Sequence, residues 1–444
     1  MIGSMSPDVE LSSQANVDPL GPVFISYRQS DGTDIAVALA WSLRAAGVPV
    51  WHDQTDLPPG DTATRLREAL ASGLSGAILV VTPDISMSDV VRNIELPAVL
   101  ELSHHPSFTL SIVSTVTKDS TSEALDYSAP DRLLGTAPGT LAAINQKPVR
   151  SASARFDVAQ AQARRRLEHL RPVIAAAGNE LLLDVQSRVP PFAATYDAHL
   201  VMRLRPPAAG QRRPSRAALE DLRGFLGYLP QLIAIGGATS LNVRGGAHLS
   251  IACAIGASVP TTLLGIVSVV DTAGNRWDLD GQPPVEGERQ VVAPVEPIAH
   301  RRERGPVLVY ADLLPQRSDR AFSDLGEDSD FAGVAHLRPV DDGLLDPISA
   351  AHIVGELTSA MRELAGHHRT TEVHLLLRCP YPIAVLLGRS LNTLTVHLYE
   401  WEDSDEADHS GPRYVPSLVL RSGAGGSSIH RVSAPPTPPT TEAT

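Results

Sequence analysis

The chain has 444 residues, and at roughly 150 residues per domain this length predicts about three domains. Its 43% hydrophobic and 20% charged residues indicate packed cores and exclude a chain that is disordered throughout. The net charge of −13 argues against a protein that coats duplex DNA or RNA, because that function needs a basic surface. The negative net charge does not exclude a small anionic ligand that binds in a local basic pocket. The two cysteines, Cys253 and Cys379, are too few for a disulfide framework and suit the reducing cytoplasm.

The first part of the chain alternates strand and helix patterns. Residues 1–20 are polar, predict a flexible lead and contain no signal peptide. Strands are predicted at GPVFISYR (21–28), VPVWH (48–52), GAILVVT (76–82) and FTLSIVSTV (108–116). Helices are predicted at 34–46, 62–72 and 88–102. Units of ~25 residues in this order predict a parallel α/β domain that ends near residue 145.

The second part contains a weak internal repeat. It opens with an amphipathic helix at 153–170, whose charges we interpret as a solvated face. Five residues recur at one constant spacing: Ile251, Ala252, Gly256, Ser258 and Thr261 return as Ile383, Ala384, Gly388, Ser390 and Thr393. Each copy lies between two apolar strands, and upstream of each lies a further strand (HLVMRL, VLVYADLL) and a helix (216–229, 349–365). The pattern predicts two similar α/β halves, at about 150–300 and 305–425, followed by a disordered tail at 426–444.

One uncharged stretch, 249–270, is long enough to suggest a membrane helix. Pro260 and several serines, threonines and glycines interrupt it. We therefore interpret it as a buried helix, a turn and a buried strand, and we expect no association with a membrane.

Four motifs of the first part occur in a specific order. They are FISYR at 24–28, VPVWHD at 48–53, LPPGD at 57–61, and Glu95 within SDVVRNIEL. In this order they resemble a TIR domain over residues 21–145, and they are similar to bacterial TIR domains that cleave NAD. The resemblance implies a flavodoxin-like parallel sheet with Glu95 as the catalytic residue. That family often carries an aromatic residue four positions before its catalytic Glu, where this chain has Val91, so Trp41 or Trp51 is expected to supply the stacking face.

The chemistry of NAD cleavage requires only one catalytic carboxylate. Nicotinamide leaves as a neutral base, so no general acid is needed, and a carboxylate beside the ribose stabilises the developing oxocarbenium cation. Glu95 lies near the start of a helix that follows the third strand, where open α/β sheets bind ligands. Glu101 is the weaker candidate, and the plain alternative is that Glu95 is a surface residue. Residues expected to bind NAD are Phe24, Ser26, Arg28, Trp41, Trp51 and Asp53, although Trp51 fits a core position equally well.

The second part resembles a SAVED domain, which is built like two fused CARF-type halves. The segments on which this resemblance rests are GGAHLSIACAIGASVP at 245–260, VVDTAGNRWDL at 269–279, and VHLLLRCPYPIAVLLGRSLN at 373–392 with VHLYEWE at 396–402. The resemblance spans 150–425. It implies that the chain binds a cyclic oligonucleotide, made by a separate synthase in the CBASS systems of antiphage defence.

Phosphates suit arginine forks and helix N-termini, and bases suit aromatic faces. Residues of these types lie at corresponding strand ends: Arg203, Arg205, Gly245, Gly246, His248, Tyr310, Asp312, Arg378 and Tyr381. The alternatives are solvated arginines, a plain turn at Gly245 and Gly246, and a capping or core role for His248. The pairs His104–His105 and His367–His368 are not expected to bind metal, because adjacent residues do not share a helix face. No cofactor or metal ion is expected.

Together the two resemblances imply a cyclic-oligonucleotide-activated NAD+ glycohydrolase that depletes NAD in abortive infection. The implied ligand is a cyclic trinucleotide such as cyclic tri-adenylate. The alternative is a non-catalytic TIR scaffold that recruits partners. The two domains are joined directly, so a ligand that reshapes one chain can drive head-to-tail assembly into oligomers or filaments. We expect the loop 53–61 to contact a neighbouring TIR domain in such an assembly.

Overall fold

The computed structural model describes residues 16–51, 73–119, 123–188, 197–207, 211–280, 291–328, 330–341, 343–403, 411–421 and 426–434. The chain forms two compact units. The first unit comprises Met1–Ala177 and Pro191–Arg203, and the second comprises Gly178–Pro190 and Leu204–Thr444.

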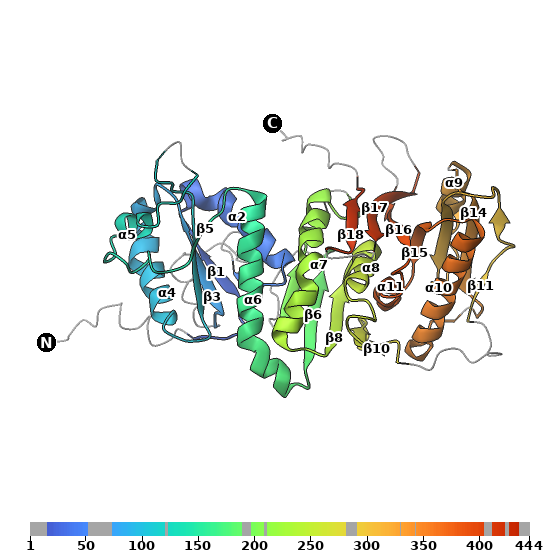
Figure 1. The fold of residues 1–444 in the computed structure, drawn as a ribbon, viewed down its shortest axis with the longest axis horizontal. Coiled ribbons are helices and arrows are strands. Elements are labelled where there is room, and N and C mark those ends of the chain that lie inside the picture. The colour runs from blue at the N-terminus through green and yellow to red at the C-terminus, as the bar shows by residue number, and fades with distance from the viewer. Residues whose placement is uncertain are drawn as a thin grey trace. The chain divides into compact units, whose positions relative to one another are not determined.

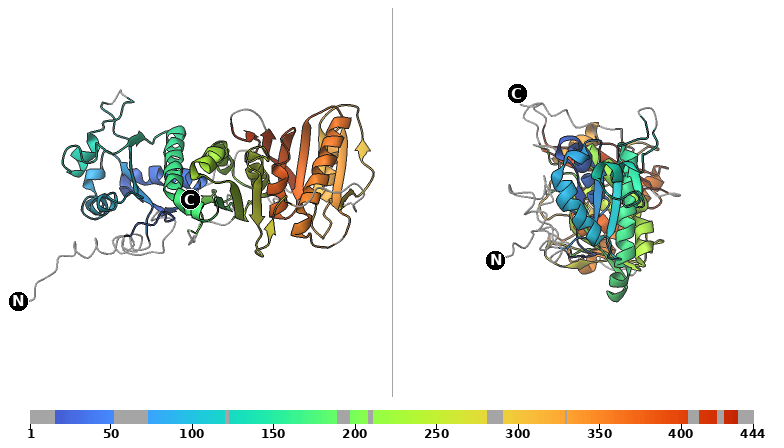
Figure 2. Two further views of the ribbon diagram at one scale, coloured as in Figure 1. Left: turned by 60° about the horizontal axis from the view of Figure 1, so that its bottom comes forward. Right: turned by 90° about the vertical axis from the view of Figure 1, so that its left-hand side faces the viewer.

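The first unit is built on a parallel sheet in the order β2-β1-β3-β4-β5, and helices cover both of its faces (Figures 1 and 2). Its strands are β1 (Val23–Ser26), β2 (Val50–Trp51), β3 (Gly76–Val81), β4 (Thr109–Ser114) and β5 (Gln146–Pro148). This is the flavodoxin-like strand order. Strand β2 is added on one side of β1, and β3, β4 and β5 are added on the other side, so the switch point of the sheet lies between β1 and β3. The four predicted strands are confirmed, and β5 lies just beyond the predicted end of the domain.

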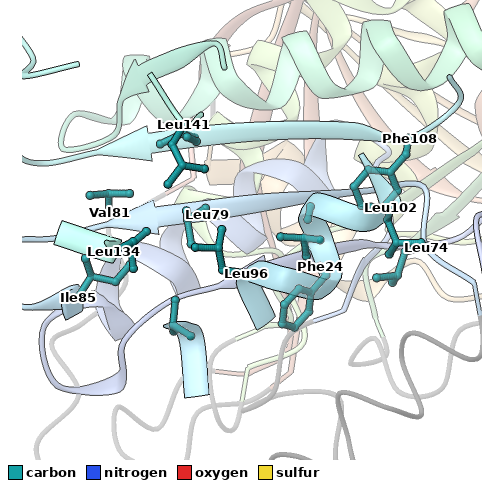
Figure 3. Close-up of a cluster of buried hydrophobic side chains, with 14 residues drawn as sticks. Phe24, Leu74, Leu79, Val81, Ile85, Leu96, Leu102, Phe108, Leu134 and Leu141 are labelled. Carbon is teal, nitrogen blue, oxygen red and sulfur yellow. The ribbon is translucent and has the colours of Figure 1, made fainter. Parts of the chain in front are cut away.

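The apolar runs of this sheet form its core. β3 is buried along its whole length, as expected for a central parallel strand that is covered on both faces. Figure 3 shows the cluster around it, in which Leu79 and Phe24 from the sheet meet Leu96 and Leu102. The helices and helical turns are α2 (Gln29–Ala45), η1 (Ile85–Met87), η2 (Val91–Glu95), α4 (Leu96–Leu102), α5 (Ala129–Leu134) and α6 (Ala152–Ala176). The predicted helix at 62–72 lies outside the described residues.

The helix α6, which the sequence analysis placed in the second part, belongs to the first unit. Arg166 explains this placement. Its guanidinium is buried and donates hydrogen bonds to the carbonyl oxygens of Leu20 at 2.6 Å and of Gly21 and His199 at 2.8 Å. The neighbouring Arg164 and Arg165 lie on the solvated face, as predicted, and bind Glu168. The boundary between the two units therefore lies after α6 rather than at residues 145–150.

The second unit contains two sheets that are parallel in their centres (Figure 1). In the first, β10-β9-β8-β6 lie in that order, with β6 (Glu180–Gln186), β8 (Ser240–Gly246), β9 (Ile266–Val270) and β10 (Arg276–Trp277). The second has the order β11-β14-β13-β15-β16-β17-β18, with β12 beside β14. Its strands are β11 (Val292–Pro294), β12 (Ala299–His300), β13 (Val307–Asp312), β14 (Gly333–Pro339), β15 (Glu372–Arg378), β16 (Thr395–Glu402), β17 (Arg413–Arg421) and β18 (Ile429–Val432).

The helices of this unit follow the predicted repeat. They are α7 (Arg216–Gly236), α8 (Leu249–Ser258), α9 (Arg320–Asp328), the turn η3 (Pro347–Ser349), α10 (Ala350–His367) and α11 (Tyr381–Gly388). The strand–helix–strand copies are β8-α8-β9 and β15-α11-β16. One predicted correspondence between the two copies is wrong, namely that of HLVMRL with VLVYADLL. The partner of β15 is β13, and the corresponding partner of β8 is β6 rather than HLVMRL, which forms β7 (Leu200–Arg203) directly before α7.

The two copies meet through their helices α8 and α11. A Cβ added to Gly256 would lie 1.8 Å from the carbonyl oxygen of Val385, and one added to Gly388 would lie 2.1 Å from that of Cys253. Gly256 and Gly388 are equivalent in the repeat, and so are Cys253 and Val385. The contact is therefore reciprocal, as in a pseudo-twofold pair, and it requires glycine at both positions because backbone fills the space on each side.

Two further expectations are settled by the fold. The uncharged stretch 249–270 forms α8, a turn and β9, as predicted, and no helix in the described part of the chain is both long and apolar enough to span a membrane. The predicted disordered tail begins too early. Residues Ile429 and Val432 are buried in β18, which pairs with β17, because each inward-facing side chain of this short strand is apolar.

Candidate active site and candidate ligand cavity

A cavity of about 390 Å³ opens in the first unit at the carboxyl end of β1. This end is the switch point of the sheet, where open α/β folds bind ligands. Three segments of the chain line the cavity: the end of β1 continuing into the start of α2, the end of β2, and residues 87–95. Among the lining residues are Phe24, Arg28, Trp51, Val91 and Glu95.

Glu95 lies in the wall of this cavity with only 7% of its surface exposed. Ser26 at the end of β1 donates a hydrogen bond from Oγ to Oε2 of Glu95 at 2.6 Å. Ser26 itself is buried and is not part of the cavity lining, so it positions the carboxylate from behind. Glu101, the weaker candidate, is exposed and is not part of the cavity lining.

A π-helical turn determines where the Glu95 side chain points. The turn η2 ends at Glu95, and the N–H of Leu96 donates to the carbonyl oxygen of Val91, five residues earlier in the chain. Pro97 follows at once and has no N–H to donate, which favours such a break in the α-helical pattern. Single π turns of this kind are frequent at functional sites. The predicted helix at 88–102 is thus present, but its backbone hydrogen bonds span five residues instead of four at the candidate catalytic residue.

Aromatic faces reach the cavity from β1 and β2. Trp51 is half-buried, and its ring lies 5.4 Å from that of Phe24 at an angle of 48°. Val91 is fully buried in the cavity wall. Trp41 is not part of the lining, and its indole instead lies under the guanidinium of Arg44, 5.1 Å from the ring centre. Of the two tryptophans named from the sequence, the structure brings only Trp51 to the cavity.

The start of α2 supplies the arginine of the cavity lining. Arg28 precedes the first turn of this 17-residue helix, and Gln29 and Ser30 line the cavity with it. The guanidinium of Arg28 is held by Asp31 at 3.8 Å and by Asp84 at 3.5 Å. A helix N-terminus beside an arginine suits a diphosphate group. Asp53 and the loop 53–61 lie outside the described residues.

A second cavity, of about 500 Å³, opens in the second unit at the carboxyl ends of its parallel strands. It brings together residues of both halves. Gly245 and Gly246 come from the end of β8, and Arg378 and Tyr381 come from β15 and the start of α11. The structure therefore places these four predicted residues in one cavity.

Arg378 is anchored by a buried carboxylate. Its Nη1 donates to Oδ1 of Asp312 at 2.5 Å, and Arg338 also donates to this carboxylate. Burial would raise the pKa of Asp312, but hydrogen bonds from His336, Arg378 and Arg338 outweigh burial and lower it. Asp312 is completely buried and lies outside the cavity lining, so it holds Arg378 rather than facing a ligand.

The two predicted tyrosines differ in their surroundings. Tyr310 is completely buried, its hydroxyl donates to the carbonyl oxygen of Ser318 at 2.6 Å, and it is not in the lining. Tyr381 lines the cavity. Its hydroxyl oxygen is buried and has no hydrogen-bond partner among the described residues. An unpaired buried hydroxyl is costly, which makes Tyr381 a donor that a ligand or water can satisfy.

Glycine is required at the end of β8. Gly245 has a φ of +107°, and an added Cβ would lie 2.1 Å from the carbonyl oxygen of Val185. Beyond it, His248 is buried at the start of α8, with Nδ1 2.8 Å from Oγ of Ser187 and Nε2 2.6 Å from the carbonyl oxygen of Arg212. Burial lowers the pKa of His248. Its ring is thus occupied by structural hydrogen bonds outside the cavity lining.

The last two predicted arginines also lie outside this lining. Arg203 ends β7 and falls in the first unit, where its Nη1 donates to the carbonyl oxygen of Met202. Arg205 donates from Nε to Asp221 at 2.8 Å. Neither side chain is among those that surround the 500 Å³ cavity.

Several lining residues were missed by the sequence analysis. They are Arg188, Tyr399, Glu400, Trp401 and Tyr414. Arg188 follows β6, so the carboxyl end of a parallel strand was the available signal. The others lie on β16 and β17, an antiparallel pair whose sequence alone carries no indication of which half it faces.

Comparison with known proteins assigns both units. Residues 229–420 match the model of the SMODS-associated and fused to various effectors sensor domain, SAVED, and residues 23–130 match the model of the TIR domain. Both resemblances inferred from the sequence are thereby confirmed.

Two curated relatives match the TIR part. The NAD(+) hydrolase PdTIR of Paracoccus denitrificans is 34% identical over 84 residues, which are 18% of this chain and 28% of that protein. The 2' cyclic ADP-D-ribose synthase AbTIR of Acinetobacter baumannii is 33% identical over 130 residues, 27% of this chain and 45% of that protein. The chain thus spans less than half the length of either relative. A Cap4 SAVED/CARF-domain receptor of Acinetobacter baumannii, solved with the cyclic trinucleotide 2'3'3'-cAAA, has a TM-score of 0.45 at 13% identity. The match covers 89% of this chain and 99% of that chain.

Proposed function

We propose that this chain, which joins a TIR domain to a SAVED sensor domain, is a NAD+ glycohydrolase that a cyclic oligonucleotide activates. The observation that carries the proposal is the Glu95 carboxylate, held by Ser26 at 2.6 Å in the wall of a cavity at the switch point of the sheet. Both curated relatives are named for chemistry on NAD or for a product derived from it, which supports the same substrate.

In the proposed reaction NAD binds with its diphosphate at the start of α2, beside Arg28, and its nicotinamide ribose near Glu95. The bond between C1′ and the nicotinamide nitrogen breaks, and its electrons leave with the neutral base. Glu95 stabilises the cation that forms at C1′. Water, or a hydroxyl of the same molecule, then adds to C1′ and loses its proton to solvent. Trp51 is the aromatic face available for stacking, since Val91 offers none.

The activating ligand is proposed to bind the 500 Å³ cavity between the two halves of the SAVED part. A cyclic trinucleotide such as cyclic tri-adenylate, supplied by a separate synthase, is the ligand that we favour. Its phosphates suit Arg188 and Arg378, and its bases suit Tyr381 and Trp401. The start of α8 is a poorer phosphate site, because Glu400 already accepts a hydrogen bond from the N–H of Ser250 there at 2.8 Å.

We further propose that the ligand drives chains into oligomers or filaments in which neighbouring TIR domains complete each active site. The direct fusion of sensor and effector in one chain supports this idea, because a ligand that reshapes one chain can create a surface that packs head to tail against the next.

A panel of cyclic di-, tri- and tetranucleotides mixed with the protein and NAD tests the function as a whole. We expect NAD cleavage only with a trinucleotide, a rise in particle size by light scattering with the same ligand, and a specific activity that increases steeply with protein concentration. Assembly without NAD cleavage would instead indicate the non-catalytic TIR scaffold. A fully active monomer, with a rate strictly proportional to concentration, would contradict activation by assembly.

The ligand cavity is tested by Arg188→Glu. Arg188 is an exposed side chain of the cavity lining, so the substitution reverses a charge without disturbing the core. The loss of one charge-assisted hydrogen bond to a phosphate costs about 1.5–3 kcal/mol, so we expect cyclic tri-adenylate to bind roughly 10- to 100-fold more weakly in calorimetry. Arg421→Glu, an exposed arginine that is not in the lining, is the matched control. Equal affinities in both variants would place the ligand elsewhere.

A further inference from the structure

Three histidines converge at the end of α10, away from both cavities described above. His367 is the last residue of α10, His368 follows it, and His300 comes from β12. One ring nitrogen of each lies within 4.8 Å of those of the other two. Nδ1 of His300 and Nε2 of His368 lie 3.0 Å apart.

A backbone hydrogen bond determines the tautomer of His368. Its Nδ1 lies 2.7 Å from the carbonyl oxygen of Arg302. A carbonyl oxygen only accepts hydrogen bonds, so Nδ1 carries the proton and Nε2 presents its lone pair to the other two histidines. The same arrangement orients metal-binding imidazoles in general, because the second ring nitrogen donates to a carbonyl or carboxylate. His368 is completely buried, which fixes the ring further.

A glycine leaves room for this lone pair. Gly333 pairs with His300 in the register of β12 and β14. A Cβ added to Gly333 would lie 2.5 Å from Nε2 of His368. Any other residue at this position would therefore crowd the nitrogen that faces the cluster.

We propose that His300, His367 and His368 form a binding site for a transition-metal ion. Imidazole ligands suit zinc, copper, iron and nickel, and zinc is the ion that fits best because it accepts three nitrogens and one open position. In tetrahedral coordination, nitrogens about 2.0–2.1 Å from zinc lie roughly 3.4 Å apart. The separation of 3.0 Å between His300 and His368 is close to that value.

The surroundings of the cluster suggest what the ion does. His300 and His367 also line a cavity of about 390 Å³ that contains Glu363, one helical turn before His367. The fourth coordination position therefore faces water or a carboxylate. A bound ion would join the short strand β12 to the end of α10 and so fasten the outer part of the second sheet.

This site was not anticipated. The sequence analysis argued that adjacent histidines face apart on a helix, and for this pair that argument is wrong: α10 ends at His367, and the rings of His367 and His368 lie 4.8 Å apart. The third member is 67 positions away in the chain, on a strand of two residues.

The other histidine cluster of this unit has a different character. The rings of His374 and His397 are stacked 4.3 Å apart at 14°, and Oε1 of Glu372 lies 3.5 Å and 3.1 Å from their Nε2 atoms. Both Nε2 atoms thus face a carboxylate of the protein, and Nδ1 of His374 is paired with the Tyr399 hydroxyl at 2.6 Å. We therefore restrict the metal proposal to His300, His367 and His368.

The experiment uses the full chain without an affinity tag, stripped with EDTA and titrated with Zn²⁺ against a chromogenic chelator. We expect one Zn²⁺ per chain, and a melting temperature raised by at least about 4 °C in excess Zn²⁺, because an ion that binds only the folded state stabilises it. His300→Ala and His367→Ala replace exposed side chains, so both variants should fold, and each should bind Zn²⁺ at least about 10-fold more weakly.

His430→Ala, which removes an exposed histidine from β18, is the control and should bind like the parent chain. The proposal is overturned if the parent binds no stoichiometric Zn²⁺, or if His300→Ala and His367→Ala bind it as tightly as His430→Ala does. The readouts do not involve NAD or a cyclic nucleotide, so they stand apart from the proposed function.

Discussion

Glu95→Gln is expected to lower NAD cleavage by ~10²-fold or more, the scale of deleting one preorganised electrostatic group. Glutamine keeps the shape of the side chain and still offers an oxygen to the Ser26 hydroxyl, now 2.6 Å from Oε2. What it removes is the negative charge opposite the developing cation. The rate is to be measured by nicotinamide release at saturating activator, together with the affinity for the cyclic nucleotide, which should not change.

Glu101→Gln is the matched control for this experiment. It makes the same chemical change six residues later, in the adjoining helix α4, at an exposed position outside the cavity. Its rate should equal that of the parent chain. Near-normal turnover in Glu95→Gln would remove Glu95 from the reaction, whatever the control shows.

Gly256→Ala is expected to destabilise the SAVED part by more than about 3 kcal/mol. The new methyl group would lie 1.8 Å from the carbonyl oxygen of Val385, and backbone atoms rather than flexible side chains fill the space around it. The helices α8 and α11 would have to separate, and the reciprocal contact at Gly388 would be lost with them. The free energy of unfolding is to be measured by denaturant titration.

Gly355→Ala provides the comparison. Gly355 lies within α10, and an added Cβ there meets nothing within 4 Å among the described residues. Alanine is the better helix former, so this change should be neutral or stabilise the chain by about 0.5–1 kcal/mol. If Gly256→Ala unfolded like Gly355→Ala, the close packing of the two halves would not be a requirement of the fold.

Most helices and strands of this chain, and their order, could be predicted from sequence patterns. Continuous apolar runs such as that of β3 indicate buried parallel strands, and their alternation with helices predicts the sheet whose switch point holds the cavity. Glu95 was named through the resemblance of four ordered motifs to a TIR domain, and its position after the third strand agrees with that role, because open α/β sheets bind ligands at the carboxyl ends of their strands. The repeat was visible because five residues recur at one constant spacing. Gly256 and Gly388 are one of these pairs, and backbone comes too close for a side chain at both of them.

The contacts between side chains of different elements could not be predicted in the same way. Periodicity assigns a residue to a face of its own element, but it carries no information on what packs against that face. Ser26 therefore could be placed at the rim but not beneath Glu95, 69 residues away, and Trp41 could not be separated from Trp51. The same limit hid Arg188 in the ligand cavity and His300 beside His367 and His368, because each contact joins segments whose proximity is created by the packing of the sheets.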